Sequence, residues 1–284
     1  MTAFEARGAQ PMLTLRTASG AMARIATHGA QVMSWTHGGR ERLFMSPRAV
    51  SQPGKAIRGG IPFIFPQFGD RGPGLRHGFA RLLEWAPVPA VDAPDRAALV
   101  LRESEESLRW WPYRFRAELE VHLLDERLSI SVAITNCDTV DFDFTAALHT
   151  YLRVSDISQA ALLGLRGQPF LDGANGRAPG LQSEEALHFA GEVERVYPDS
   201  GGRELTLVDA VDAIRVSATG FTDTVVWNPG PGLAAGLADL GPGQHTHFVC
   251  AEAARVETPV RVSPGASWRG SQVLACRPTP APLR

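Results

Sequence analysis

Hydrophobic and polar positions alternate most regularly between residues 115 and 135. Apolar side chains occupy every second position of 117–123 and again of 128–134, and Asp125 and Glu126 separate the two runs. Successive side chains of a β-strand point to opposite faces, so this pattern is typical of strands with one buried face. The two runs and the polar turn between them predict an antiparallel hairpin.

Shorter runs of the same kind predict that most of the remaining chain forms short strands. We expect them at 13–15, 21–26, 32–35, 42–45, 97–102, 142–154, 192–196, 205–207, 213–217, 221–229, 247–251 and 271–276. The polar segment 103–107 is predicted to be a turn, and 28 glycines and 21 prolines favour turns over long helices. The sequence therefore predicts an all-β fold whose many short strands pack as one large β-sandwich.

Two of the predicted strands carry a polar residue suited to acid–base chemistry. In 142–154, His149 lies on the face opposite Phe142 and Phe144, and we expect it to point into solvent or a cleft. Glu252 directly follows the apolar run 247–251, at the expected end of that strand. Imidazole and carboxyl groups can act as general acid and base near neutral pH. The alternatives are structural: a hydrogen-bonded histidine on a strand face, and a carboxylate paired with Arg255.

The segment 58–81 breaks the strand pattern and concentrates positive charge. Glycines and prolines interrupt regular structure throughout it. Between residues 55 and 81 the only acid is Asp70, although the whole chain has a formal net charge of -2. The basic residues there are Lys55, Arg58, Arg71, Arg76 and Arg81, and His77 lies among them. This excess predicts a site for a small anion, with a solvated loop carrying scattered arginines as the alternative.

Trp110 and Trp111 stand next to each other before Pro112. Two adjacent tryptophans could stack against a sugar ring. We interpret the pair instead as one core side chain and one at the rim of the core.

The bulk properties exclude several classes of protein. The net charge of -2 argues against a general nucleic-acid binder, and no apolar run approaches the ~18 residues of a membrane span. The first residues, MTAFEARGAQPM, lack the apolar core of a secretory signal. Three widely spaced cysteines indicate free thiols in a reducing cytoplasm, neither a disulfide framework nor a zinc motif. Nucleotide-binding, zinc-protease and serine-hydrolase motifs are absent from the sequence.

Five segments in order carry a resemblance to a known family. RGGIPFIFPQFG, HGFAR, ALHTYLRV, DTVVWNPG and FVCAEA are similar to segments of the glucose-6-phosphate 1-epimerases, the hexose-6-phosphate mutarotases of the aldose 1-epimerase superfamily. The resemblance runs from about residue 12 to residue 275. It implies a galactose-mutarotase-like β-supersandwich of mainly antiparallel strands, with a shallow site on a concave sheet and neither a metal nor an organic cofactor. It also implies that 1–284 is a single domain with a core of about 12–276 and a loose tail at 277–284.

The resemblance also implies roles for individual residues. His149 of ALHTY is the expected general acid, and Glu252 of CAEA is the expected general base. Arg58 and Arg81 are expected to bind the substrate phosphate, with structural salt bridges as the alternative. His77 is expected to bind a sugar hydroxyl or to orient the sugar ring. Asp223 of DTVVWNP is interpreted as structural, since short polar side chains at turns usually bond the backbone.

Three positions depart from the family pattern. Arg76 stands where glutamine is common, so it is either a third phosphate contact or an exposed residue. Glu194 stands where relatives carry aspartate, and its longer side chain puts the expected substrate contact in question. Ala253 replaces the proline that follows the catalytic glutamate, which loosens the backbone there.

The resemblance predicts an isomerase that interconverts the α and β anomers of a hexose 6-phosphate, with glucose 6-phosphate the expected substrate. An epimerase of unphosphorylated aldoses and a non-catalytic carbohydrate-binding β-sandwich are the alternatives. We expect the partner to be a small sugar phosphate, with no nucleic acid or membrane involved, and the protein to be a monomer or weak homodimer.

Overall fold

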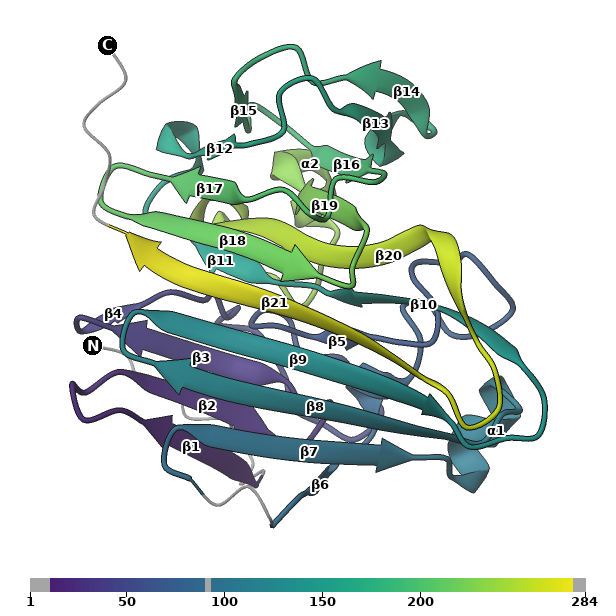
Figure 1. Cartoon of the computed structure of the whole chain (residues 1–284). Coiled ribbons are helices and arrows are strands. Elements are labelled where there is room, and N and C mark those ends of the chain that lie inside the picture. The colour runs from purple at the N-terminus through teal and green to yellow at the C-terminus, as the bar shows by residue number, and fades with distance from the viewer. Residues whose placement is uncertain (1–10, 90–92, 278–284) are drawn as a thin grey trace.

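The computed structural model describes residues 11–89 and 93–277, and these are mostly antiparallel strands (Figure 1). Within them the strands form three sheets, of four, eight and nine strands. The prediction of an all-β fold is confirmed. The proposed tail 277–284 lies outside the described residues except for Arg277. The four-stranded sheet has the order β1-β2-β3-β4 and consists of β1 (Met12–Arg16), β2 (Met22–Ala26), β3 (Val32–His37) and β4 (Arg40–Glu41).

The nine-stranded sheet contains the predicted hairpin. Its strands follow the order β15-β12-β17-β18-β21-β9-β8-β7-β6. They are β6 (Ala86–Pro87), β7 (Arg96–Arg102), β8 (Phe115–Leu124), β9 (Arg127–Asn136), β12 (Ala161–Leu163), β15 (Ala186–His188), β17 (Leu205–Val208), β18 (Ala213–Thr219) and β21 (Ser267–Arg277). β8 and β9 pair from Phe115 opposite Asn136 to Leu124 opposite Arg127, so the hairpin prediction is confirmed.

The eight-stranded sheet has the order β14-β13-β16-β19-β20-β10-β5, and β11 pairs with β20 beside this path. Its strands are β5 (Phe63–Ile64), β10 (Phe142–Leu148), β11 (Tyr151–Arg153), β13 (Pro169–Asp172), β14 (Ala178–Leu181), β16 (Val193–Tyr197), β19 (Asp223–Asn228) and β20 (Phe248–Val262). β20 continues well past Glu252, so the expectation that Glu252 ends its strand was wrong.

Helical segments are short in the described residues. They are α1 (Glu105–Trp110), α2 (Gly230–Ala235) and the 3₁₀ turns η1 (Ala80–Leu82), η2 (Ile157–Gln159), η3 (Gly173–Asn175) and η4 (Gln244–His247). The turn expected at 103–107 is instead the start of α1. The hydroxyl of its cap Ser104 accepts a hydrogen bond from the Ser107 N–H, and the Ser107 hydroxyl accepts one from the Ser104 N–H. Serine replaces the usual Glu or Gln in this capping box, so the sequence signal was weak.

The hydrophobic core lies between the two large sheets. Leu148 of β10, Ala251 of β20, Leu119 of β8 and Leu274 of β21 belong to one buried cluster. Aromatic rings cross the interface, for example Phe144 of β10 against Trp268 of β21, with ring centroids 5.5 Å apart. The two sheets therefore form the layers of a sandwich, as Figure 1 shows.

The predicted strand 142–154 is interrupted where it carries its histidine. β10 ends at Leu148 and β11 begins at Tyr151, which leaves His149 and Thr150 between two strands. The His149 N–H donates to the Pro62 carbonyl at 3.0 Å, so the main chain at His149 still runs beside the 58–81 segment, where β5 pairs with β10. Buried Gln272 of β21 accepts from the Thr150 hydroxyl and donates to the Ala251 carbonyl, which ties the interruption to the opposite sheet.

Candidate active site

His149 and Glu252 lie far apart in the sequence and are in contact in the structure. His149 follows β10, Glu252 lies in the neighbouring strand β20, and Leu148 pairs with Ala253. The His149 Nε2 atom is 3.3 Å from Glu252 Oε1, and the two side chains are 12% and 1% exposed. An imidazole and a carboxyl group at this distance can exchange a proton.

Burial sets the protonation of this pair. It lowers the pKa of His149 to about 3, with a further contribution from the positive charges of Arg58 and Arg81. It also raises the pKa of Glu252 well above its usual value, and the negative charge of Glu194 adds to this. Desolvation disfavours the charged form of each group. These two shifts favour neutral imidazole beside a carboxylic acid over imidazolium beside carboxylate.

Several buried polar atoms at this place have no hydrogen-bond partner within the described residues. They include His149 Nδ1, Glu252 Oε2 and Arg81 Nε. Buried polar atoms are normally paired, because leaving one unpaired costs free energy. Three such atoms in one cluster indicate a site that a polar ligand completes.

Aromatic rings enclose the imidazole of His149. The Tyr151 ring stacks on it with centroids 4.8 Å apart and an angle of 14° between planes. His77 and Trp227 meet it edge-on, each at 5.8 Å. These contacts restrict how the imidazole can turn.

Arg58 lies at the site but is already bound to protein groups. Its Nε donates to Asp239 Oδ2, its Nη2 lies 3.1 Å from Asp239 Oδ1, and its Nη1 donates to the Tyr151 hydroxyl at 3.0 Å. Tyr151 and Asp239 both raise the pKa of Arg58. Arg58 therefore contributes a fixed positive charge, with only part of its donors open to a ligand.

Arg81 and His77 come from the end of the 58–81 segment. The Arg81 Nη2 donates to the Arg76 carbonyl at 2.9 Å, and burial lowers the pKa of Arg81 to about 10. His77 has a left-handed backbone with φ of 60°, and its Nδ1 accepts from the Gly69 N–H. Burial, followed by the neighbouring His149 and arginines, lowers the pKa of His77 to about 2. His77 is therefore a neutral donor or acceptor beside His149.

Arg76 and Glu194 differ in how they join the cluster. Arg76 points outward and pairs with Asp70 at 3.0 Å, with both side chains about two-thirds exposed. Glu194 of β16 pairs with Trp227 of β19 in the sheet, and burial raises its pKa. The Glu194 carboxylate packs so closely on Gly173 that a Cβ there would come within 2.6 Å of it. The charge of Glu194 therefore acts on the pKa of Glu252, whereas Arg76 lies at the exposed rim of the site.

Sequence reasoning missed Tyr151 and Asp239. Tyr151 lies two residues after His149, and strand alternation places it on the same face, so its position carried a usable signal. Asp239 lies in a glycine-rich segment where no pattern marks it. Asp223 is buried, and its Oδ2 accepts from the N–H groups of Val256 and Glu257, in keeping with its structural interpretation.

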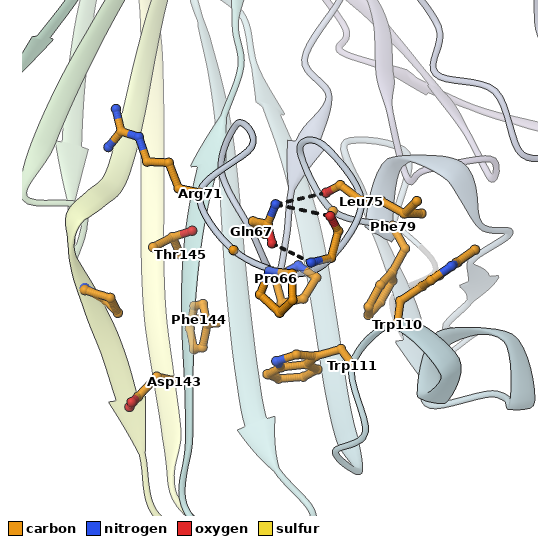
Figure 2. A pocket seen from close by; sticks show the side chains of 15 residues that line it. Pro66, Gln67, Arg71, Leu75, Phe79, Trp110, Trp111, Asp143, Phe144 and Thr145 are labelled. Carbon is orange, nitrogen blue, oxygen red and sulfur yellow. Dashed lines mark hydrogen bonds between the residues drawn. The ribbon is translucent and has the colours of Figure 1, made fainter. Parts of the chain in front are cut away.

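The tryptophan pair lines a different pocket, of about 160 Å³. Figure 2 shows Trp110, Trp111, Phe144 and Pro66 around it, with Gln67 hydrogen-bonded to the loop 69–75 above. Both tryptophans are partly buried and pack against the core. Of the basic residues in the predicted anion site, Arg71 lines this pocket and pairs with Glu257, whereas none of the residues to which the resemblance gave a role lines it.

Residues 11–89 and 93–277 offer neither a cluster of metal ligands nor a membrane-spanning helix. No group of three or more His, Cys, Asp or Glu side chains there is arranged to hold a metal ion. No helix in these ranges has the length and apolar character needed to cross a membrane. The expected absence of a cofactor stays a prediction.

Comparisons with known proteins match nearly the whole chain. The aldose 1-epimerase family model matches residues 11–275. The "Putative glucose-6-phosphate 1-epimerase" of Cenchrus ciliaris is 37% identical over 94% of this chain and 85% of its own length. The protein of the same name from Escherichia coli K12 is 32% identical over 85% of this chain and 82% of its own length.

Solved structures agree with these matches. The crystal structure of a "putative mutarotase (YeaD)" from Salmonella typhimurium has a TM-score of 0.85 and 28% identity, and covers 94% of this chain and 90% of that chain. The galactose mutarotase related enzyme from Lactobacillus acidophilus has a TM-score of 0.78 at 14% identity, over 96% of this chain and 100% of that one. The predicted galactose-mutarotase-like fold is confirmed. The chain belongs to the aldose 1-epimerase family.

Proposed function

We propose that this chain interconverts the α and β anomers of a hexose 6-phosphate, with glucose 6-phosphate as substrate. The observation that carries the proposal is the 3.3 Å contact between His149 and Glu252, both buried and both with one unpartnered polar atom. The two oxygens that must exchange protons during anomerisation are bonded to the same carbon, C1. An acid and a base that act on them must therefore lie next to each other.

The reaction follows from moving one proton within this pair. Glu252 accepts the proton of the C1 hydroxyl while His149 gives a proton to the ring oxygen, and the C1–O5 bond breaks to form the open aldehyde. After rotation about C1–C2, Glu252 returns a proton to the aldehyde oxygen and His149 takes the proton from O5 as the ring closes on the other face. The pair carries one proton before and after ring opening, on His149 before and on Glu252 after.

Burial acts differently on the two arrangements of this proton. The charged arrangement, imidazolium beside carboxylate, exists before ring opening, and the neutral arrangement exists after it. Burial lowers the pKa of His149 and raises that of Glu252, so it favours the neutral arrangement. The shared proton must therefore move from Glu252 to His149 before ring opening, and ring opening restores the arrangement that burial favours.

The positive charge of the arginines at the site supports a phosphorylated substrate. Arg81 has an unpartnered buried Nε, and no carboxylate in the described residues pairs with it, so its charge is open to an anion. Arg58 adds positive charge to the same site, and Arg76 stands at its rim as a further phosphate contact. His77 is proposed to bind a sugar hydroxyl and Glu194 to bind another on the side of Glu252.

We further infer that the protein works in the cytoplasm as one domain and as a monomer or weak homodimer. Cys137, Cys250 and Cys276 are free thiols, which suits a reducing compartment. One hydrophobic cluster includes residues of all three sheets, which supports a single domain.

Exchange NMR on the anomeric protons of glucose 6-phosphate tests the function. We expect the wild type to accelerate exchange above the buffer rate, and Glu252→Gln to lower the catalysed rate by ~10²–10⁴-fold. Glu120→Gln in β8 is the matched control and should keep the wild-type rate. The same assay with glucose, alone and as a competitor, distinguishes an epimerase of unphosphorylated sugars. Exchange at the buffer rate with wild-type protein would overturn the proposal.

A further inference from the structure

The imidazole of His149 is held without a hydrogen bond at its second nitrogen. Its Nε2 faces Glu252, while its buried Nδ1 has no partner. A histidine that transfers protons is usually oriented by a hydrogen bond from the nitrogen that does not react. The orientation of this imidazole must therefore come from its Nε2 contact with Glu252 and from the rings packed on it.

The Tyr151 ring is the surface on which the imidazole rests. The two rings are nearly parallel, 14° apart, at 4.8 Å. Tyr151 is itself almost fully buried and packs against Phe248 at 5.2 Å, Trp227 at 6.1 Å and Phe44 at 6.5 Å. A ring fixed on several sides can define the plane of its neighbour.

The hydroxyl of Tyr151 is fixed through Arg58. The Arg58 Nη1 donates to the Tyr151 hydroxyl, while Nε and Nη2 grip the two carboxylate oxygens of Asp239, each at 3.1 Å. A planar guanidinium bound in this two-pronged way has a set orientation. Asp239 is anchored in turn, because its carbonyl accepts the Ser46 hydroxyl at 2.6 Å.

We propose that Tyr151 and Asp239 are positioning residues for the proposed anomer exchange. Asp239 orients Arg58, Arg58 holds the Tyr151 hydroxyl, and the Tyr151 ring sets the plane of the His149 imidazole. Neither residue needs to touch the sugar. The inference rests on the proposed function, and it assigns Arg58 mainly to orientation and Arg81 to the substrate anion.

Three variants separate the steps of this chain. In Tyr151→Leu the stacked ring is lost, and we expect kcat to fall ~10²-fold, the scale of a misplaced catalytic group. Tyr151→Phe keeps the ring but not the hydroxyl, and Asp239→Asn weakens the grip on Arg58, so each should lower kcat by about tenfold. KM for glucose 6-phosphate should change less than kcat in both Tyr151 variants. Because Asp239 and Tyr151 act in one chain, the double variant Asp239→Asn/Tyr151→Phe should be no slower than the worse single variant.

A second readout distinguishes orientation from stability. The titratable groups that face His149 are Glu252, His77, Arg58, Arg81 and Tyr151. Opening the stack in Tyr151→Leu admits water to the imidazole. The pKa of His149, followed by ¹⁵N NMR of the ring, should then rise from about 3 toward its ordinary value. The acid limb of the pH–kcat profile should move the same way.

The control variants make the same Tyr→Phe and Asp→Asn substitutions at positions outside the candidate site. Tyr113→Phe alters a tyrosine that contacts Trp111 and Phe142, and Asp212→Asn alters an aspartate that pairs with Arg40 and Arg42. Both should keep the wild-type kcat. Wild-type kcat in Tyr151→Leu, or additive losses in the double variant, would overturn the positioning roles. If the wild type itself does not accelerate exchange, the proposed function fails, which is a different result.

Discussion

The two large sheets differ most in how regularly their strands pair. In the nine-stranded sheet, β9 pairs with β8 and with β21 without any shift in register. In the eight-stranded sheet, β10 shifts its register against β20 between Phe144 and Ala146, stops at Leu148, and is followed by β11 at Tyr151. The regularly paired nine-stranded sheet supports the fold. The interruption after β10 in the other sheet carries His149, which contacts the buried carboxyl group of Glu252.

A histidine in each sheet makes the difference concrete. His122 of β8 lies on the outer face, 25% exposed, and its Nε2 is 3.4 Å from Asp95 Oδ2. His149 is buried against Glu252 with one ring nitrogen unpartnered. The same residue type is thus a surface group in one sheet and a candidate acid in the other, so activity and stability should respond to different substitutions.

The largest effect is expected from exchanging these two histidines for asparagine. His149→Asn removes the group that protonates the ring oxygen, so catalysed anomer exchange should fall by ~10²–10⁴-fold. His122→Asn should leave the rate within twofold of wild type, by the same NMR assay. Equal exchange rates in the two variants would contradict the proposal that His149 takes part in catalysis and His122 does not.

A core substitution in the nine-stranded sheet should give the opposite pattern. Leu119 of β8 is 1% exposed in the main cluster, so Leu119→Ala should lower the free energy of unfolding by ~2–5 kcal/mol. The kcat of the folded protein should stay near wild type. Urea unfolding and the exchange assay at low temperature measure both quantities. A kcat loss as large as that of His149→Asn would contradict the separation.

The regular sheet was largely predictable from the sequence, because its signals are local. Alternation and a polar turn predicted β8 and β9 with their pairing. The interruption of β10 was not predictable in the same way. His149 and Thr150, which lie at the interruption, bond the Pro62 carbonyl and Gln272, residues far away in the sequence whose contacts no local pattern encodes.

The candidate site also has a part that was predictable from the sequence and a part that was not. His149 and Glu252 stood out as polar residues at apolar strands, and the family resemblance gave them roles. The aromatic stack on His149 and the pairing of Arg58 with Asp239 came only from the structure. Arg58 and Arg81 looked alike as loop cations, and only their partners distinguish them.

A smaller effect is expected where the two sheets are joined. Gln272 of β21 is fully buried and bonds Thr150 and the Ala251 carbonyl. Gln272→Leu removes both bonds and leaves the Thr150 hydroxyl only a 3.5 Å contact with the Leu148 carbonyl, so the free energy of unfolding should fall by ~1–3 kcal/mol. Adding Thr150→Val removes this hydroxyl, so the double variant should recover part of the loss. A double variant that is less stable than Gln272→Leu alone would show that the amide does not act through Thr150.

The last prediction concerns how stability depends on pH. His77 is held neutral in the native state with a pKa of about 2, below its ordinary value near 6.5. As pH falls below about 6.5, the unfolded chain binds a proton at His77 that the native protein does not bind, so stability falls by no more than ~1.4 kcal/mol per pH unit for this group.

His77→Asn removes that contribution, and asparagine tolerates the left-handed backbone at this position. The raised pKa of Glu252 acts in the opposite sense, because its stabilising proton is lost as pH rises, but it is common to both proteins. Urea unfolding between pH 6.5 and pH 4 should therefore give a shallower acid decline for His77→Asn than for wild type. Parallel curves would mean that His77 takes up its proton equally in the native and unfolded states, so that burial does not hold it neutral.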